Sequence, residues 1–484
     1  MQAERYIAAA DLGSSKIALS VARVEGDDIQ IIYYKETPSD GVRYSCVFNP
    51  MRASVPLKKA ISEAEEELKI KILQVVVGLP RYGVRQEAQS ARMERSDPDS
   101  CITKEEVTLL KNMAIDDYPL KEGSKEAIYG AVAQSFSADD EMICASESDV
   151  IGTTADNIEG NFKIFFGAQK SINNIDIMLN NTNVAPSHKL FLPNAVAQAV
   201  LTDEEKENGV ALIEFGAGVT SLTIYRGKIL RHYSAIPFGG KSITSDIRYE
   251  CGFTDHLAEN IKLAFGACMP DKLASLSEKI IQINDDETGS YEQLPVKYLS
   301  EIIDSREREI VDAMLYMIQE SGYADKLRNG VVITGGAANM VNLTNLIRER
   351  SGYTVRVGYP RARSFSADGC AGINEMSAAA SIGMILEAKK DPHLNCTEDV
   401  YVAPAPAEEK VREEEGPAAQ SAAVPEEPEL FNTEVITPNK KRRDRNEKKS
   451  KGLISWSGIT RKLGNMAEKA FDNTVGDLFD DMGE

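Results

Sequence analysis

The sequence is poor in the features that mark several other classes of protein. Its seven cysteines are scattered and form no C-x-x-C pair, and its four histidines show no metal-ligand spacing. A zinc-stabilised or disulfide-rich domain is therefore not expected, and we predict reduced thiols. No uninterrupted apolar run approaches the roughly 18–20 residues that span a bilayer, and the first residues show no signal-peptide pattern. These absences predict a cytosolic protein that is soluble or peripheral to a membrane.

Positive charge is also scarce over most of the chain. The formal net charge is −20, so most of the surface repels a polyanion and a general nucleic-acid binder is not expected. The exception is KKRRDRNEKKSK at 440–451, which holds eight basic and two acidic residues. A chain of 484 residues is too long for one compact core, so two or more domains are expected.

The order of predicted elements repeats about two hundred residues apart. The first copy reads as three strands, a helix and a strand (6–10, 17–24, 29–34, 55–69 and 75–77). The second copy reads as three strands and a helix (210–213, 221–225, 229–236 and 242–249). This pattern predicts a duplicated α/β unit whose two copies form separate domains. A smaller α/β segment at about 81–165 separates them, and residues 255–325 are mostly helical.

In each copy, one glycine-containing turn follows the first strand. DLGSSK (Asp11–Lys16) and EFGAGVTS (Glu214–Ser221) combine glycine, which lets the backbone approach a ligand, with hydroxyl groups that donate hydrogen bonds. Each turn alone is more often a plain hairpin. In equivalent places of a duplicated unit, however, they can clamp the phosphates of one nucleotide from both sides. Asp11 could also hold Mg²⁺ through water.

A third turn, ITGGAANM (333–340), joins a strand to a helix and leaves room for an adenosine group, although a simple turn is equally compatible with it. GGKS at 239–242 resembles the end of a Walker A loop. It lacks the leading glycine and follows Pro237, so we do not expect a P-loop.

These motifs, in this order, resemble the actin superfamily and, within it, the FtsA family. The stretches that carry the resemblance are DLGSSKIAL, the segment from AVLTDEEKENG to IPFGG, TSDI, AENIKLAFG and ITGGAANM. The resemblance implies duplicated actin-like (ribonuclease H-like) α/β domains with an inserted FtsA-type subdomain. The implied segments are domain 1A (1–80, 166–205 and 361–390), the inserted subdomain 1C (81–165), domain 2A (206–254 and 326–360), subdomain 2B (255–325), a disordered linker with the basic run (391–450) and an amphipathic membrane-targeting helix (451–484).

The resemblance also implies a nucleotide site for ATP with Mg²⁺. Its expected nucleotide-binding residues are Gly13, Ser14, Ser15, Lys16, Gly216, Gly218, Thr220, Glu259, Lys262, Gly335, Gly336 and Ala337. Glu214 is a second possible metal ligand beside Asp11. The family usually has aspartate at Glu214 and glycine at Ala217, and the longer Glu214 side chain would displace its carboxylate. We therefore expect weak ATPase activity at most.

The C-terminal region has a different composition. From about residue 392 it is rich in Ala, Pro and Glu, as in disordered linkers. Beyond the basic run, apolar residues recur at helical spacing, among them Trp456, Ile459, Leu463, Met466 and Phe471. Such a segment can bind a membrane surface, dock on its own domain or pair with a partner helix. A disordered tether before it favours the membrane.

The predicted function is therefore that of a cell-division adaptor on the cytoplasmic face of the inner membrane, at the septum. The resemblance implies self-assembly into filaments, binding of the FtsZ tail, with Arg306 as a contact, and recruitment of later division proteins. The alternatives are a pilus-assembly adaptor of the same fold and a sugar or acetate kinase. Neither of these accounts for the amphipathic tail.

Overall fold

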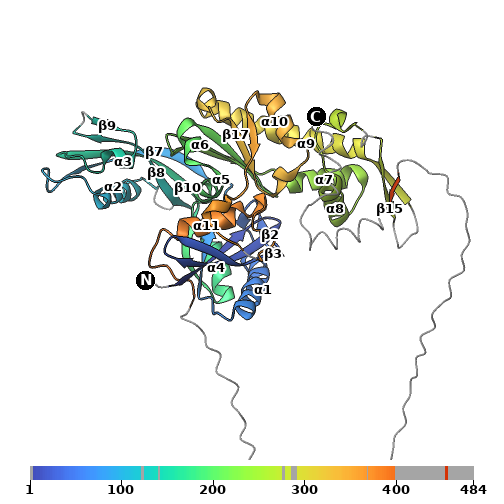
Figure 1. Ribbon diagram of the computed structural model, residues 1–484, viewed down its shortest axis with the longest axis horizontal. Helices are drawn as coiled ribbons and strands as arrows, with labels where there is room; N and C mark the ends of the chain where they lie inside the picture. Colours follow the sequence, from blue (N-terminus) through green and yellow to red (C-terminus); the bar gives the residue numbers. More distant parts are fainter. Residues whose placement is uncertain are drawn as a thin grey trace, which may run out of the picture.

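The computed structural model describes residues 4–120, 125–139, 142–274, 278–284, 291–367, 369–397 and 453–455. Figure 1 shows two α/β lobes, one below the other, with a smaller unit projecting to the left of the upper lobe and a helical unit to its right. We call the part built on the N-terminal sheet the first lobe, and the part built on the sheet that contains 210–236 the second lobe.

The first lobe is built on one mixed sheet. Its strands, in spatial order, are β11 (Ala185–Leu190), β6 (Gln74–Gly78), β1 (Arg5–Leu12), β2 (Lys16–Glu25) and β3 (Asp28–Pro38). Helices α1 (Pro50–Leu68) and α4 (Gln169–Thr182) pack below this sheet, and α5 (Leu192–Val200) and α11 (Ala379–Ala388) pack above it (Figure 1). The short hairpin of β4 (Val42–Arg43) and β5 (Cys46–Val47) lies beside α4.

The sheet of the second lobe repeats this arrangement. Its spatial order is β14 (Ile229–Ile236), β13 (Thr220–Arg226), β12 (Val210–Phe215), β17 (Val331–Thr334) and β18 (Val355–Val357). In both sheets an antiparallel meander of three strands is followed by two strands parallel to its first strand. The duplication predicted from the sequence is thus present as two sheets of equivalent order. Short α6 (Asp203–Asn208) precedes the second meander and α10 (Leu343–Ser351) follows β17.

The inserted unit has its own sheet and core. Its strands are ordered β7 (Arg85–Glu94), β10 (Asn157–Ala168), β8 (Glu126–Ala138) and β9 (Met142–Cys144), with α2 (Lys104–Asp116) and α3 (Glu147–Val150) packed on them. Phe136, Phe162 and Phe166 are buried in this core. The Gln134 side-chain amide donates to the Leu230 carbonyl at 2.9 Å, which joins the insert to β14 of the second lobe.

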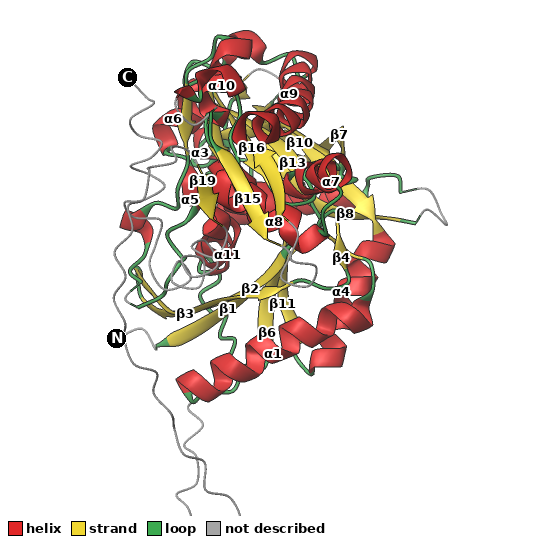
Figure 2. Cartoon of the chain, turned by 90° about the vertical axis from the view of Figure 1, so that its right-hand side faces the viewer, coloured by secondary structure: helices red, strands yellow, loops and turns green. Residues whose placement is uncertain are grey.

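The helical unit flanks the second lobe and shares one hydrophobic core with it. It contains α7 (Gly240–Cys251), α8 (Asp255–Phe265), the long α9 (Val296–Glu320), β15 (Ile280–Asn284) and β16 (Tyr291–Pro295). Figure 2 places α8 and β15 above the sheet of the first lobe. Short 3₁₀ helices complete the described chain (270–272, 324–326, 336–339, 362–364 and 376–378). The domain boundaries given above stay a prediction, although α7 packs on α8 and α9.

The structure corrects two expectations for the C-terminal region. Residues 391–397, predicted as the start of the linker, are part of the first lobe, because Leu394 and Cys396 are buried and the Cys396 amide donates to the Tyr6 carbonyl. Leu453–Ser455, predicted as helix, form β19, a parallel neighbour of β15. Trp456, Ile459, Leu463, Met466, Phe471 and the basic run lie outside the described residues. Within the described residues, no helix has the length and hydropathy needed to cross a bilayer.

Candidate functional site

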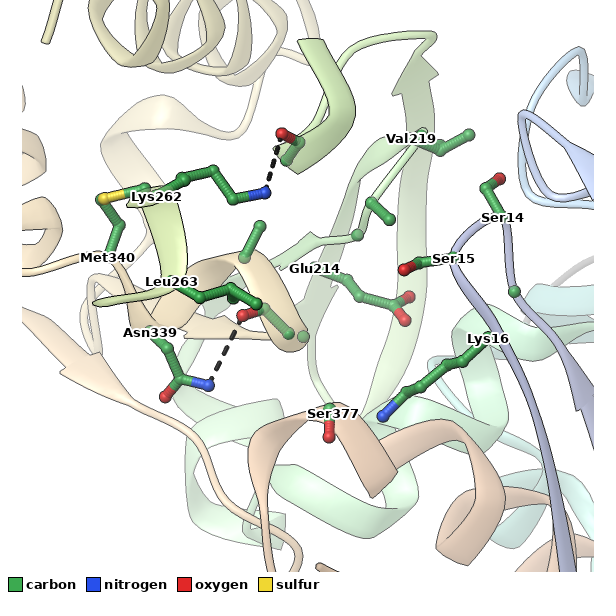
Figure 3. A pocket seen from close by; sticks show the side chains of 18 of the residues that line it. Ser14, Ser15, Lys16, Glu214, Val219, Lys262, Leu263, Asn339, Met340 and Ser377 are labelled. Atoms are coloured by element: carbon green, nitrogen blue, oxygen red, sulfur yellow. Dashed lines mark hydrogen bonds between the residues drawn. The ribbon is translucent and has the colours of Figure 1, made fainter. Parts of the chain in front are cut away.

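A cavity of about 460 Å³ lies where the two lobes and the helical unit meet (Figure 3). Three turns line it: the β1–β2 turn, the β12–β13 turn and the turn after β17. Eleven of the twelve predicted nucleotide residues line the cavity: Gly13, Ser14, Ser15, Lys16, Gly216, Gly218, Glu259, Lys262, Gly335, Gly336 and Ala337. The structure thus brings together residues that are more than three hundred positions apart in the sequence.

The β1–β2 and β12–β13 turns face each other in direct contact. A Cβ atom at Gly218 would lie 2.7 Å from the Ser14 hydroxyl oxygen, so the second turn can approach the first only without a side chain there. The Ser14 hydroxyl accepts a hydrogen bond from the Ser45 amide at 3.0 Å. In Figure 3, Ser15 and Lys16 extend from the first turn beside Glu214 of the second. The two glycine-containing turns therefore line the same cavity and touch each other.

Thr220 is the one predicted nucleotide residue that does not line the cavity. It is fully buried in β13, and its hydroxyl donates to the Phe238 carbonyl at 2.9 Å. Thr220 therefore holds the second turn against the chain before α7, and the structure does not support a phosphate contact from its side chain.

The opposite end of the cavity is built by α8 and the turn after β17. The Lys262 ammonium donates to the Gly240 carbonyl at 3.1 Å and to Glu259 at 2.8 Å. Gly335 has a φ of +91°, and a Cβ atom there would meet the Phe215 carbonyl at 2.4 Å. Leu263 and Met340 add apolar surface to this end (Figure 3). A polar end beside an apolar end suits a ligand that has an anionic part and a flat, uncharged part.

The comparisons with known proteins agree with this geometry. The profile of the family described as "Cell division protein FtsA" matches residues 211–383. "Cell division protein FtsA" of Neisseria meningitidis serogroup B (strain ATCC BAA-335 / MC58) is 28% identical over 362 residues, which cover 74% of this chain and 85% of that protein. The protein of the same name from Borreliella burgdorferi (strain ATCC 35210 / DSM 4680 / CIP 102532 / B31) is 28% identical over 351 residues, covering 72% and 83%.

The chain is therefore similar in sequence to the FtsA family. This similarity agrees with the resemblance found from the sequence motifs. Among solved structures, a chain of the "PilM-PilN type IV pilus biogenesis complex" matches with a TM-score of 0.55 and 15% identity, covering 80% of this chain and 98% of that one. At this identity the match shows a shared fold.

Two charged residues line or border the site but were not predicted. Arg81 follows β6 and lies against Asp11 and Glu214 in the cavity wall. Lys241, in the dismissed GGKS motif, donates from its ammonium to the Ser14 carbonyl at 2.7 Å. Burial lowers the pKa of Lys241, although Glu259 opposes this effect. GGKS lies close to the second turn in the sequence, and this could have identified Lys241 as a site residue. The local sequence around Arg81, LPRYG, contains no motif that would have identified it.

The expected magnesium ligands do not form an open pair of carboxylates. Glu214 accepts from the Arg81 Nε at 3.0 Å, and Asp11 lies 3.6 Å from Arg81 Nη2. The part of the chain that the structure describes contains no group of three or more His, Cys, Asp or Glu residues arranged to hold a metal ion. Because a guanidinium already contacts both carboxylates, these residues do not fit Mg²⁺ as they stand.

The predicted FtsZ contact, Arg306, lies on α9 away from the cavity. Its guanidinium donates to both carboxylate oxygens of Asp246 on α7, at 2.6 and 3.0 Å, and lies over the Phe238 ring. The hydrogen bonds and the charge of Asp246 raise the pKa of Arg306, although partial burial opposes this. A quarter of its side chain remains exposed, so this fixed charge is accessible at the surface.

Proposed function

We propose that this chain is an FtsA-like, ATP-binding, actin-like adaptor that polymerises and tethers FtsZ filaments to the cytoplasmic membrane. There, at the septum, it would recruit later division proteins. The observation that carries the proposal is the cavity in which the two glycine turns and the turn after β17 meet. The similarity to FtsA proteins supports the division role and the FtsZ partner.

The nucleotide that we expect is ATP. The two facing turns offer backbone and hydroxyl donors for its phosphates, and Gly335, Gly336 and Ala337 leave space for its adenosine. The cavity volume, about 460 Å³, is within the usual range for small-molecule sites. Mg²⁺, which the sequence also predicts, would have to share the carboxylates of Asp11 and Glu214 with Arg81.

Slow hydrolysis is part of the proposal. A carboxylate that assists attack by water must be free to accept a hydrogen bond from it. Glu214 instead accepts from Arg81 at Oε2, so one of its two oxygens is occupied and its carboxylate is held toward the guanidinium. We expect nucleotide to act mainly by joining the lobes, with little turnover.

Membrane attachment would come from residues 451–484 and the preceding basic run. Each basic residue close to an anionic leaflet contributes on the order of 1 kcal/mol. Insertion of Trp456, Ile459, Leu463, Met466 and Phe471 would add apolar burial, which together gives reversible binding to the surface.

A co-flotation experiment tests the tethering. The full chain, purified FtsZ, ATP and vesicles containing phosphatidylglycerol are mixed and centrifuged through a density gradient. We expect FtsZ in the floated fraction only when the chain is present. The double variant W456E/L463E should lose flotation because two apolar anchors become charged, and it leaves β19 intact. A double variant with the same charge change in the predicted linker, V424E/L430E, should float like the wild type.

Each contrary outcome removes a different part of the proposal. If the wild-type chain stays at the bottom of the gradient, membrane tethering is wrong. If the chain floats and FtsZ does not, the partner is wrong, and an adaptor for another assembly, such as a pilus, becomes the better interpretation.

A further inference from the structure

Arg81 lines the cavity and lies between two carboxylates of opposite lobes. Its Nε donates to Glu214 of β12 at 3.0 Å, and its Nη2 lies 3.6 Å from Asp11 of β1. Its Nη1 donates to the Ser45 hydroxyl at 3.2 Å, and only 9% of its side chain is exposed. The Tyr233 hydroxyl donates to the Arg81 carbonyl, which fixes the backbone at this residue. The guanidinium is therefore a buried part of the cavity wall that is hydrogen-bonded on both sides.

The charge of Arg81 does not titrate in the range where proteins work. An arginine side chain stays protonated in proteins. Burial opposes its charge, but Glu214 and Asp11 outweigh burial, and the pKa of Arg81 is raised above its ordinary value. The cavity thus always carries a positive charge at the position between these two carboxylates.

This is the position at which the sequence predicts a magnesium ion. Magnesium needs near-octahedral oxygen coordination and usually keeps several waters, so it needs free carboxylate oxygens and space. Here one oxygen of Glu214 is engaged by Arg81. The Oδ1 atom of Asp11 is buried without a hydrogen-bond partner among the described residues, and the guanidinium lies closest to it as an ion-pair partner. A divalent cation bound to these oxygens would lie in contact with the guanidinium, which carries charge of the same sign.

Other cations surround the same space from both lobes. Lys16 extends from the first turn and pairs with Glu36, and Lys241 contacts the Ser14 carbonyl at 2.7 Å. Lys262 lies at the far end, where it contacts Glu259 at 2.8 Å. These ammonium groups can turn toward an anion without displacing any core residue, because each is at the end of a flexible chain. Together with Arg81 they can offset the charge of a polyphosphate.

We propose that Arg81 replaces the divalent metal ion, so that this chain binds nucleotide without needing Mg²⁺. The inference rests on the proposed nucleotide binding and specifies the form of the ligand: the free nucleoside triphosphate or diphosphate anion. Arg81 neutralises Asp11 and Glu214 in the absence of ligand, which keeps the two turns together, and its remaining N–H groups meet the phosphates when the ligand binds.

The test measures the affinity for a fluorescent methylanthraniloyl derivative of ATP, once with Mg²⁺ in excess and once with excess EDTA. For the wild-type chain we expect the two dissociation constants to agree within about threefold. In R81Q we expect affinity in EDTA to fall by about tenfold or more and to be largely restored by Mg²⁺. R81K keeps the positive charge but lacks the bidentate guanidinium donor, so we expect an intermediate loss of affinity in EDTA.

The matched control is R85Q, which removes an arginine of the insert that pairs with Glu126 and lies over the Phe166 ring. It should bind like the wild type under both conditions. The comparison within the wild-type chain stands even if a variant does not fold.

The outcomes separate this inference from the proposed function. Wild-type binding that requires Mg²⁺ overturns the role of Arg81 and leaves the nucleotide site in place. R81Q that binds as well as the wild type in EDTA also overturns it. Absence of binding under both conditions overturns the nucleotide site and this inference together.

Discussion

Glu307 is a buried glutamate whose protonation makes the stability of the fold depend on pH. It lies on α9, is 1% exposed, and its Oε2 atom has no hydrogen-bond partner among the described residues. Burial raises the pKa of Glu307 to about 8, Lys262 opposes this shift and Asp304 adds to it. The thiol of Cys268, itself buried, is also close. Glu307 is therefore neutral at pH 7 in the folded protein and ionised in the unfolded chain.

We predict that E307Q stabilises the protein increasingly as the pH rises from about 5 to about 8. In this window the folded state holds a proton that the unfolded chain has released, so the wild-type free energy of unfolding falls by up to about 1.4 kcal/mol per pH unit. Glutamine does not titrate, so the variant lacks this loss of stability with rising pH. Urea denaturation should show the variant gaining about 2 kcal/mol on the wild type between about pH 5 and pH 7.

The exposed Glu301 on the same helix provides the control, because E301Q removes a charge without a burial effect. Its unfolding free energy should follow that of the wild type across the window. A difference between E307Q and the wild type that does not change with pH would show that Glu307 is already ionised in the fold.

At the residue scale the sequence identified the site through its turns. Glycines between apolar strands in both copies predicted Gly13, Gly216 and Gly218, and the structure brings all three to the cavity. Thr220 was misplaced because strand alternation turns its side chain into the core. Arg81 was missed because its partners, Asp11 and Glu214, are distant in the sequence and meet it only through the fold.

At the scale of elements, α7 and α9 are joined by the ion pair of Asp246 and Arg306. Two hydrogen bonds hold the guanidinium, and the Phe238 ring lies beneath it. A second carboxylate, Glu309, accepts from Nη1 at 2.6 Å. A guanidinium fixed in this way loses little conformational freedom when a partner binds. The FtsZ contact at Arg306 stays a prediction.

We predict that R306A weakens binding of an FtsZ C-terminal tail peptide by about tenfold, which is about 1.4 kcal/mol. The loss follows from removal of a preorganised donor at the surface. Fluorescence anisotropy of a labelled peptide measures it. R308A is the matched control, since Arg308 lies on the same helix and pairs with Asp304 instead. Equal losses in the two variants would indicate a general charge effect and not a specific contact.

Element boundaries show what the sequence pattern could and could not give. The meanders were predicted because their apolar residues alternate, and α9 lies within the region 255–325 that was predicted to be mostly helical. Strand β7 was not predicted, because RQEAQSARME has only one buried residue and shows no apolar alternation. Residues 391–397 were assigned to the linker because their composition resembles it, and only the fold shows that Leu394 and Cys396 complete the core beside β1.

At the scale of the whole molecule, direct contact between the lobes at the cavity depends on a small set of groups. Lys241 reaches from α7 to Ser14, Arg81 connects to Glu214, and Gly218 rests against Ser14. Each lobe has a separate sheet, and the lobes also share a hydrophobic cluster that includes Leu212 and Val332 of the second lobe. At the cleft itself, the contacts above and what fills the cavity connect the two lobes. Nucleotide should therefore act on both lobes at once.

We predict that nucleotide at a hundredfold excess over its dissociation constant raises the free energy of unfolding by about 2.7 kcal/mol. Hydrogen exchange should slow together in the β1–β2 turn, the β12–β13 turn and the turn after β17, because all three line the cavity. A337F fills the adenosine end and should abolish the effect, whereas A362F, at an exposed position, should retain it. Slower exchange confined to one lobe would mean that the ligand binds to that lobe alone, and the idea of a nucleotide that joins the two lobes would then be wrong.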